Sequence, residues 1–411
     1  MNLKSTKVFI YSIWFFELLI ISRFTVFVRQ REGEHFASVD THAIADIFFV
    51  MVLTGLLLVS LNKSLVKSIR TTSLFWLLAY YLLSCISAVW SIMPEYSLFR
   101  AIQFTIPMLG VYVAIFKMHN FKGTEKYILI ISLIVLFLSL TPQVLARRFT
   151  LDGMHAAEYP AIAAMIFGYC FGELISTRRL VRYKWKLLHF SCLCISLCCV
   201  VIGTSSATNL SVGCGIIFSS VIARNKKVLF FSIGIVSFIF LLFGDWNWLV
   251  NSLFPGKSNA QILSAHGRVD LWKLYWYLFV NDPIVGIGFS IGARIASIYT
   301  TSTHNFIFSI LLGTGIVGAI IFSLFLLNLI RECFFSIKKR YFGSVGCSTA
   351  FFIGFINSLS YPIIGDQWFP PSMVFICFLS LFLIHVKSGH AYSSAHYHHL
   401  NRYEKEYIMR T

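Results

Sequence analysis

Residues 303–330 read THNFIFSILLGTGIVGAIIFSLFLLNLI, and this stretch decides the class of the fold. After His304 and Asn305 the run is apolar and longer than the roughly 20 residues that a helix needs to cross a bilayer. Gly315 and Gly318 lie within it, and glycines on a membrane helix allow another helix or a ligand to approach closely. An ionisable imidazole at the edge of such a helix indicates a function, so we expect His304 to belong to a catalytic site.

The composition of the whole chain agrees with this reading. Its 411 residues are 57% hydrophobic and only 12% charged, with a mean hydropathy of +0.76. A soluble domain of this size could not bury so much apolar surface, which predicts a polytopic membrane protein. The net charge of +17 would suggest nucleic acid in a soluble protein. Here the basic residues lie in short loops, where we expect them to fix topology and contact anionic lipid headgroups, with no nucleic acid partner. The cysteines lie in apolar segments or in one basic loop, a distribution that predicts neither a disulfide framework nor a zinc site.

Apolar runs of about 18–25 residues predict about twelve membrane-spanning helices. The runs lie near residues 8–28, 43–61, 72–91, 100–116, 127–146, 159–176, 185–203, 207–223, 228–246, 303–330, 342–363 and 370–386. The predicted fold is therefore an all-α integral membrane protein. Residues 1–386 are expected to form a single polytopic domain, and residues 387–411 a polar tail.

Basic clusters occupy every second connection between these runs. They are Lys63/Lys67/Arg70, Lys117/Lys122/Lys126, Arg178/Arg179/Arg182/Lys184, Arg224/Lys226/Lys227 and Arg331/Lys338/Lys339/Arg340. The positive-inside rule places these clusters in the cytoplasm together with both termini and the tail. The opposite side then carries a large loop, residues 247–302. Breakers on either side predict a short helix over Arg268–Val280 in this loop, and its aromatic residues predict an ordered segment that lies against the membrane.

Arginines surround the candidate histidine on that side. The large loop supplies Arg268 and Arg294, and nearby positive charge would keep an imidazole neutral near pH 7, as a general base requires. An interfacial histidine bonded to a backbone carbonyl is the alternative. Arg148 is also expected on this side. A guanidinium binds diphosphate oxygens in pairs, although arginines also extend to lipid headgroups without further function.

Two further polar segments are expected on the same side. The hydroxyl-rich turn Thr204–Thr208 could cap the helix that follows it, or Ser206 could help to bind an anionic group. The short loop with Asp152, His155 and Glu158 could supply an alternative base, and the sequence does not rank its members.

Several of these segments resemble the O-antigen ligase and polymerase superfamily. The resemblance rests on Gly267–Trp272, on Asn281–Phe289 and on His304-Asn305 with Gly315 and Gly318. It extends to Ser87–Ser91 with Pro94 and Arg100, to Arg148, Gly153 and His155, and to Thr204–Thr208, which is similar to the turn in exopolysaccharide polymerases. It covers most of residues 85–320.

The resemblance implies a multi-spanning glycosyltransferase of the GT-C type in the bacterial inner membrane, with about twelve helices and a site that faces the periplasm. The donor glycan would be carried on undecaprenyl diphosphate, and an acceptor hydroxyl would attack its anomeric carbon with inversion, without a metal or another cofactor. His304 would be the base or would orient the acceptor, and Arg268 would hold the diphosphate. The remaining substrate-binding candidates are Arg148, Arg294, His155, Asn305 and Ser206. Expected partners are the lipid-linked oligosaccharide, the glycan acceptor and membrane lipids, with a chain-length co-polymerase as a candidate.

Three functions remain open at this point. The favoured one is a polymerase of O-antigen, capsule or exopolysaccharide repeat units. A ligase that transfers glycan to lipid A–core is the alternative, but such ligases often carry an arginine where this chain has Ser205-Ser206-Ala207. A transporter of lipid-linked sugars would place charges near the bilayer midplane and repeat one half of the chain in the other, and neither pattern is found.

Overall fold

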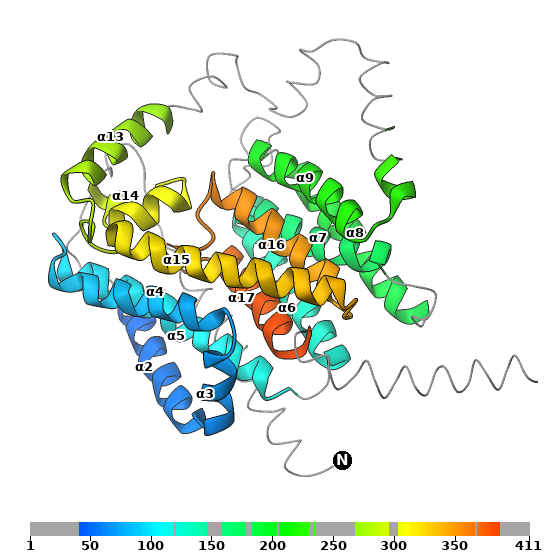
Figure 1. Cartoon of the computed structure of the whole chain (residues 1–411), viewed down its shortest axis with the longest axis horizontal. Coiled ribbons are helices and arrows are strands. Elements are labelled where there is room, and N and C mark those ends of the chain that lie inside the picture. Colours follow the sequence, from blue (N-terminus) through cyan, green and yellow to red (C-terminus); the bar gives the residue numbers. More distant parts are fainter. Residues whose placement is uncertain are drawn as a thin grey trace, which may run out of the picture.

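The computed structural model describes residues 41–118, 121–145, 158–176, 183–203, 205–230, 234, 268–295, 303–365 and 368–386. In these ranges the chain is helical, with turns and short connections and no strand (Figure 1). The helices are α2 (Thr41–Ser60), α3 (Lys63–Arg70), α4 (Leu74–Ile86), η1 (Ser87–Val89), α5 (Pro94–Phe116), α6 (Phe121–Leu145), α7 (Glu158–Ser176), α8 (Tyr183–Ile202), α9 (Ser206–Ile222), α13 (Arg268–Asn281), α14 (Gly292–Ile295), α15 (Phe306–Lys338), α16 (Ser344–Ser358), α17 (Pro370–Leu381) and η2 (Phe382–Val386).

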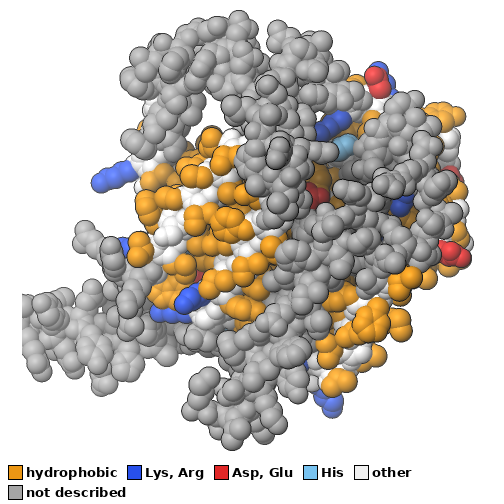
Figure 2. Space-filling model, turned by 180° about the vertical axis from the view of Figure 1, so that it is seen from behind, with side chains coloured by type: hydrophobic (Ala, Val, Ile, Leu, Met, Phe, Trp, Pro, Cys, Tyr) orange, Lys and Arg blue, Asp and Glu red, His pale blue; other side chains and the backbone are white. Residues whose placement is uncertain are grey.

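Among the described residues, five helices are long and apolar enough to cross a membrane: α5, α6, α7, α8 and α15. The number rises to six if α2 and α3, which meet at a bend of 104°, form one span. In the view of Figure 2, apolar side chains cover most of the described surface. The all-helical class is thus confirmed for the described chain. The predicted number of about twelve spans stays a prediction, since the runs expected near residues 8–28 and 228–246 lie outside or almost wholly outside the described ranges.

α15 is longer than expected. The sequence predicts a span that ends near residue 330 and then a basic loop, whereas the helix continues to Lys338. This extension is stabilised at Glu332, whose buried carboxylate accepts hydrogen bonds from the backbone N–H and the hydroxyl of Ser73 (3.2 and 2.9 Å). Ser73 is the N-cap of α4, so a carboxylate near the end of α15 accepts a hydrogen bond from a backbone N–H at the start of α4.

The helices run alternately between two ends, which we call the His304 end and the Glu173 end after the residues that mark them. α15 runs from the first to the second and α16 returns, with α15 lying between α4 and α16 (Figure 1). Described residues of the basic clusters meet at the Glu173 end. There Lys117 donates to Ser60 (2.8 Å), and Asn225, beside Arg224, donates to Ile175 at the end of α7 (3.5 Å).

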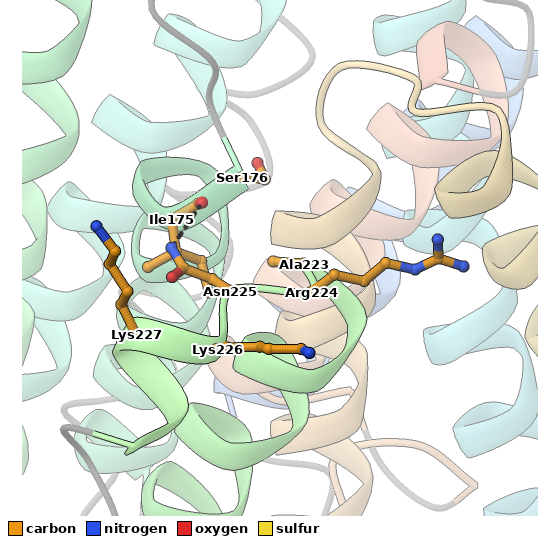
Figure 3. A pocket seen from close by; sticks show the side chains of 7 residues that line it. All are labelled: Ile175, Ser176, Ala223, Arg224, Asn225, Lys226 and Lys227. Atoms are coloured by element: carbon orange, nitrogen blue, oxygen red, sulfur yellow. Dashed lines mark hydrogen bonds between the residues drawn. The ribbon is translucent and has the colours of Figure 1, made fainter.

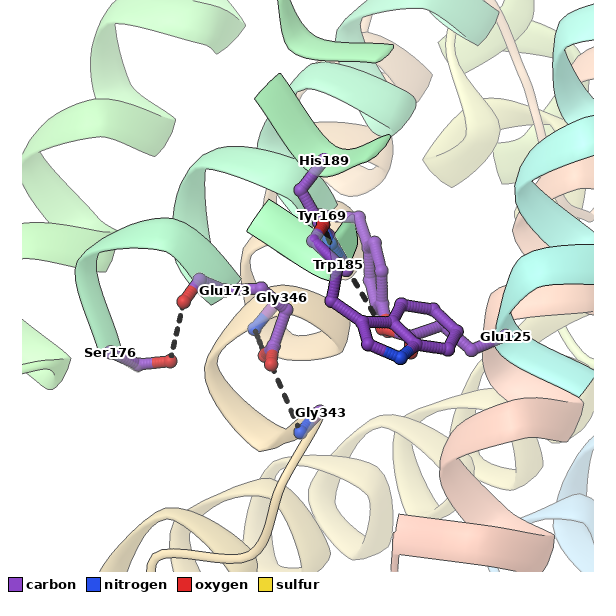
Figure 4. Close-up of polar contacts among 8 residues, drawn as sticks. All are labelled: Glu125, Tyr169, Glu173, Ser176, Trp185, His189, Gly343 and Gly346. Atoms are coloured by element: carbon purple, nitrogen blue, oxygen red, sulfur yellow. Dashed lines mark hydrogen bonds and ion pairs between the residues drawn. The ribbon is translucent and has the colours of Figure 1, made fainter. Parts of the chain in front are cut away.

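Buried carboxylates organise the Glu173 end (Figure 4). Glu173 of α7 accepts hydrogen bonds from the backbone N–H groups of Gly343 and Gly346 (3.3 and 3.0 Å), at the start of α16. A helix N-terminus has amide donors that lack partners within the helix, and a carboxylate satisfies them well. Nearby, Glu125 of α6 pairs with His189 of α8 (3.0 Å) and accepts a hydrogen bond from Tyr169. These contacts join α6, α7, α8 and α16.

Candidate active site

His304 has an unusual backbone. It precedes α15 with a φ of 52°, a left-handed conformation that costs a residue other than glycine about 1–3 kcal/mol and tends to occur at functional sites. The next residue, Asn305, is the N-cap of α15, and its side chain accepts a hydrogen bond from the N–H of Ile307 (2.9 Å). Asn305 therefore fixes the start of the helix, and the kink at His304 sets the direction of the imidazole.

Arg268 and His304 meet at one residue, Ser360. Arg268 is the first residue of α13, and its guanidinium donates a hydrogen bond to the Ser360 hydroxyl. The ring of His304 forms a hydrogen bond with the backbone of Ser360. The two residues predicted to carry the chemistry, 36 positions apart in the sequence, are thus held on the same support by contacts from α13, from the start of α15 and from the end of α16.

The protonation of His304 follows from this arrangement. Burial, and after it the positive charge of Arg268, lowers the pKa of His304 from 6.5 to about 4, against the opposing effect of the hydrogen bond to Ser360. The imidazole is therefore neutral at physiological pH and can accept a proton. Burial also lowers the pKa of Arg268 below its usual value, but a guanidinium remains charged at any physiological pH. The site therefore combines a neutral base with a fixed positive charge.

Ser360 is held in place by the end of α16. Its N–H and that of Tyr361 both donate to the carbonyl of Asn357 (2.9 and 2.8 Å). The Asn357 side chain in turn accepts from Thr208 (3.1 Å) and donates to Ser211 (2.7 Å), both on α9. The Asn357 carboxamide therefore ties the support of Arg268 and His304 to α9.

A second contact fixes the same turn from another direction. The Tyr361 hydroxyl donates a hydrogen bond to the carboxylate of Glu158 (3.0 Å), the first residue of α7. Asn357, Ser360 and Tyr361 were not among the predicted site residues. Their only signal in the sequence is a set of polar residues at the end of the apolar run near 342–363, a pattern that also fits an ordinary helix end.

The glycines predicted to allow close approach explain how α15 is built. At Gly315 the helix breaks, with φ 63° and ψ −161°, and a Cβ there would lie 2.2 Å from the carbonyl oxygen of Ile284. The loop after α13 repairs the break. The N–H groups of Ile316 and Val317 donate to the carbonyls of Pro283 and Ile284 (2.9 and 3.2 Å). The short distance at Gly315 leaves no room for a side chain.

This loop also contacts the segment that runs from the end of α4 to the first turn of α5. The N–H of Phe289 donates to the Ser87 hydroxyl (3.0 Å), the Ser97 hydroxyl donates to the Phe289 carbonyl (3.0 Å), and the Trp90 indole donates to the Val285 carbonyl (3.1 Å). Two segments that carry the family resemblance, Ser87–Ser91 and Asn281–Phe289, therefore pack directly against each other next to the break in α15.

Arg294 lies in a cluster of its own. Its guanidinium lies over the ring of Tyr96, 4.6 Å from the centroid, and that of Arg100 lies 5.1 Å from the same centroid. Arg100 also donates to Gln103 (2.7 Å). Both arginines contact an aromatic face, which is a favourable position for a cation. The structure thus places Arg294 on Tyr96, in a group that includes an arginine noted only through the resemblance.

The remaining predicted residues divide into two groups. Arg148 and His155 lie outside the described residues. Ser206 is the first residue of α9 and is buried, and its hydroxyl has no hydrogen-bond partner. The predicted hydroxyl capping of α9 is wrong at Ser205, because this N-cap residue makes no side-chain capping bond and instead accepts from Thr208 (3.1 Å).

A hollow of about 450 Å³ lies at the Glu173 end, between the end of α7 and the turn after α9 (Figure 3). It is lined by Ile175, Ser176, Ala223, Arg224, Asn225, Lys226 and Lys227. Its basic residues form one of the clusters that the sequence assigns to a topology-determining loop. No candidate base lines it, so it does not compete with His304 as the candidate active site.

Comparison with known families agrees with the geometry. A family model described as O-antigen ligase matches residues 190–323. The resemblance to the O-antigen ligase and polymerase superfamily is confirmed. The matched stretch, about a third of the chain, runs from α8 into α15 and contains Arg268, Arg294 and His304, whereas Ser360 lies beyond it. No curated protein gives a significant match. This match supports a membrane-embedded, glycosyltransferase-like enzyme of polysaccharide biosynthesis.

Proposed function

We propose that this protein polymerises polysaccharide repeat units carried on undecaprenyl diphosphate, at the periplasmic face of the bacterial inner membrane. The observation that carries the proposal is the meeting of Arg268 and His304 on Ser360. A neutral imidazole beside a guanidinium is the pair that glycosyl transfer from a diphosphate donor needs, because the reaction releases a proton on one side and a phosphate anion on the other.

The proposed mechanism uses each group once. The acceptor hydroxyl loses its proton to His304 as its oxygen forms a bond to the anomeric carbon of the donor sugar. The bond between that carbon and the diphosphate oxygen breaks, and polyprenyl diphosphate leaves with the bonding electrons. Arg268 compensates the charge that develops on the leaving diphosphate, an effect that is large where water is excluded. Attack opposite the leaving group inverts the anomeric centre.

The remaining candidates extend this site. Arg294, with Arg100 beside it on Tyr96, could bind a second anionic group of the glycan. The turn Ser205-Ser206-Ala207 lacks the arginine that ligases often carry there, and this favours polymerase over ligase. Transfer of finished glycan to lipid A–core remains the second candidate function, supported by the match of residues 190–323 to the O-antigen ligase family model.

The test is the glycan profile of cells that lack the protein and are complemented with variants at matched expression. His304→Ala and Arg268→Ala are compared with Arg70→Ala, which removes an exposed arginine at the opposite end. We expect the His304 variant to lose a factor of about 10²–10⁴ in transfer rate, the usual contribution of a general base. Arg70→Ala should retain the full profile.

The accumulated species distinguishes the two candidate functions. Single repeat units on the lipid carrier or on the final acceptor, without long chains, would identify a polymerase. Long chains retained on the lipid carrier would identify a ligase. Wild-type glycan in both His304→Ala and Arg268→Ala would refute this active site.

A further inference from the structure

α13 has two different faces. Leu271, Tyr275 and Phe279, spaced four residues apart, are buried, and Tyr275 and Trp272 lie against Phe308 of α15 with ring centroids 6.1 Å away. This face attaches the helix to the protein. Of the aromatic residues that predicted a segment lying against the membrane, Trp272, Tyr275 and Phe279 therefore face inward.

The outward face is apolar along one edge. Trp276 and Val280, one turn apart, are each 55% exposed, and Ile284 in the following loop is 66% exposed. Asp270 and Lys273 lie on the adjacent edge and form an ion pair in solvent (3.0 Å). An apolar edge with a tryptophan beside a charged edge is typical of a helix that lies in the membrane interface. With 14 residues α13 is also too short to span a bilayer, which takes about 20.

The apolar edge continues onto a spanning helix. Ile284 and Pro283 accept hydrogen bonds from the first two residues after the break in α15, and from there Ile316, Val317 and Ile320 are exposed on α15. From Ile316 to Lys338 the helix has 23 residues, or about 35 Å, enough to cross the hydrocarbon core alone. This length allows the break at Gly315 to lie at the membrane boundary of the His304 end, where α13 packs against α15 (Figure 1).

We propose that α13 lies in the interface of the membrane leaflet at the His304 end, with Trp276, Val280 and Ile284 in contact with lipid acyl chains. Asp270 and Lys273 then face the water. Because Arg268 begins this helix, the interface holds its guanidinium near the depth of the lipid phosphates, where the diphosphate of a lipid-linked donor would lie. That last step rests on the proposed function, whereas the membrane contact does not.

The test is photo-crosslinking of the full-length protein in native membranes. A diazirine amino acid is placed at Trp276 or Val280, with Ile320 as the spanning reference and Asp270 as the water-facing reference, and adducts are identified by mass spectrometry. We expect phospholipid adducts at positions 276, 280 and 320 and at least tenfold fewer at position 270. Adducts to a second copy of the chain at positions 276 and 280 would overturn the proposal. Equal lipid labelling at positions 270 and 280 would also overturn it. So would a lack of lipid adducts at position 320, because the proposal requires the apolar edge of α13 to continue onto a lipid-facing α15.

A kinetic measurement tests the consequence for Arg268. Trp276→Ser should raise the KM for a long-chain polyprenyl donor severalfold with little change in kcat. The control is Tyr277→Ser, because Tyr277 is 66% exposed and lies one turn after Lys273 on the water-facing edge. It should change neither constant. Unchanged KM in Trp276→Ser would separate α13 from donor binding. The crosslinking result needs no glycosyl transfer, so it stands or fails independently of the proposed enzyme activity.

Discussion

His304 is buried beside the positive charge of Arg268, and these two causes determine the pH range in which the base is available. Since the pKa of His304 is lowered to about 4, the imidazole is neutral throughout the physiological range. We expect kcat/KM to be flat between about pH 6 and 8 and to fall as the pH drops through about 4, where His304 becomes protonated.

Arg268→Gln should move the fall in kcat/KM at low pH, the acid limb of the profile, to higher pH. The variant removes one cause of the lowered pKa, the positive charge, and leaves the other, burial. Arg268→Lys keeps the charge and should leave the acid limb near the wild-type position. Both variants should lose rate, because glutamine lacks the positive charge and lysine lacks the planar fork of the guanidinium. The measurement is kcat/KM against pH in lipid nanodiscs, with samples returned to pH 7 to confirm that the loss is reversible. An identical limb in the glutamine variant would show that Arg268 does not act on the base.

Ser360 is a positioning residue, and its two hydrogen bonds can be separated by mutation. Ser360→Ala removes the hydroxyl that accepts from Arg268 but keeps the backbone that bonds His304. A hydrogen bond to a charged group contributes about 1.5–3 kcal/mol, so we expect kcat/KM to fall about 10- to 100-fold without a shift of the acid limb. Ser360→Thr should restore most of the rate because it keeps a hydroxyl. If Ser360→Ala retained wild-type kinetics, the guanidinium would be oriented by other contacts.

At the scale of helices, α7 and α16 pack backbone to backbone at Gly172 and Gly346. A Cβ at Gly172 would lie 2.9 Å from the Cα of Gly346, and one at Gly346 would lie 2.7 Å from the carbonyl of Tyr169. Backbone atoms cannot move aside cheaply, so these glycines set the separation of the helices. Since α16 carries Asn357 and Ser360 at its other end, the packing also determines where the support of the candidate active site lies.

Gly172→Ala should therefore destabilise the protein. We expect a loss of about 1–3 kcal/mol, the usual effect of overpacking a tight contact, measured as a lower unfolding temperature in detergent. Gly213→Ala on α9 is the matched control, because its added Cβ would meet nothing within 4 Å. It should be neutral or slightly stabilising, as alanine is the better helix former. Equal effects of the two substitutions would mean that α7 and α16 do not touch at Gly172.

At the scale of the molecule, the sequence predicted what depends on periodicity and composition. The apolar runs anticipated most helices within a few residues, and breakers predicted Arg268–Val280, which is observed as Arg268–Asn281. For Gly315 the sequence predicted only that another segment or a ligand can approach the helix closely. The break in α15 could not be predicted, because it depends on the carbonyls of Pro283 and Ile284. Ser360 could not be foreseen, since its part depends on a contact across 92 positions to Arg268.

The same argument extends to the orientation of the whole chain. The basic clusters occupy alternate connections in the sequence, and their described members gather at the Glu173 end, whereas Arg268 and His304 lie at the other. Positive charge is retained on the cytoplasmic side during insertion, so we expect the Glu173 end to be cytoplasmic and the His304 end periplasmic.

Cysteine labelling can test this orientation. Lys226→Cys and Asp282→Cys place exposed thiols at the two ends, and the exposed native Cys194 and Cys198 lie on α8, within a candidate span. A membrane-impermeant maleimide added to intact cells should label position 282 and not position 226, and permeabilised cells should show both above the wild-type background. The reverse pattern would place His304 in the cytoplasm. A donor presented on the periplasmic side could then not reach it, and the proposed polymerase would be wrong however well its residues are arranged.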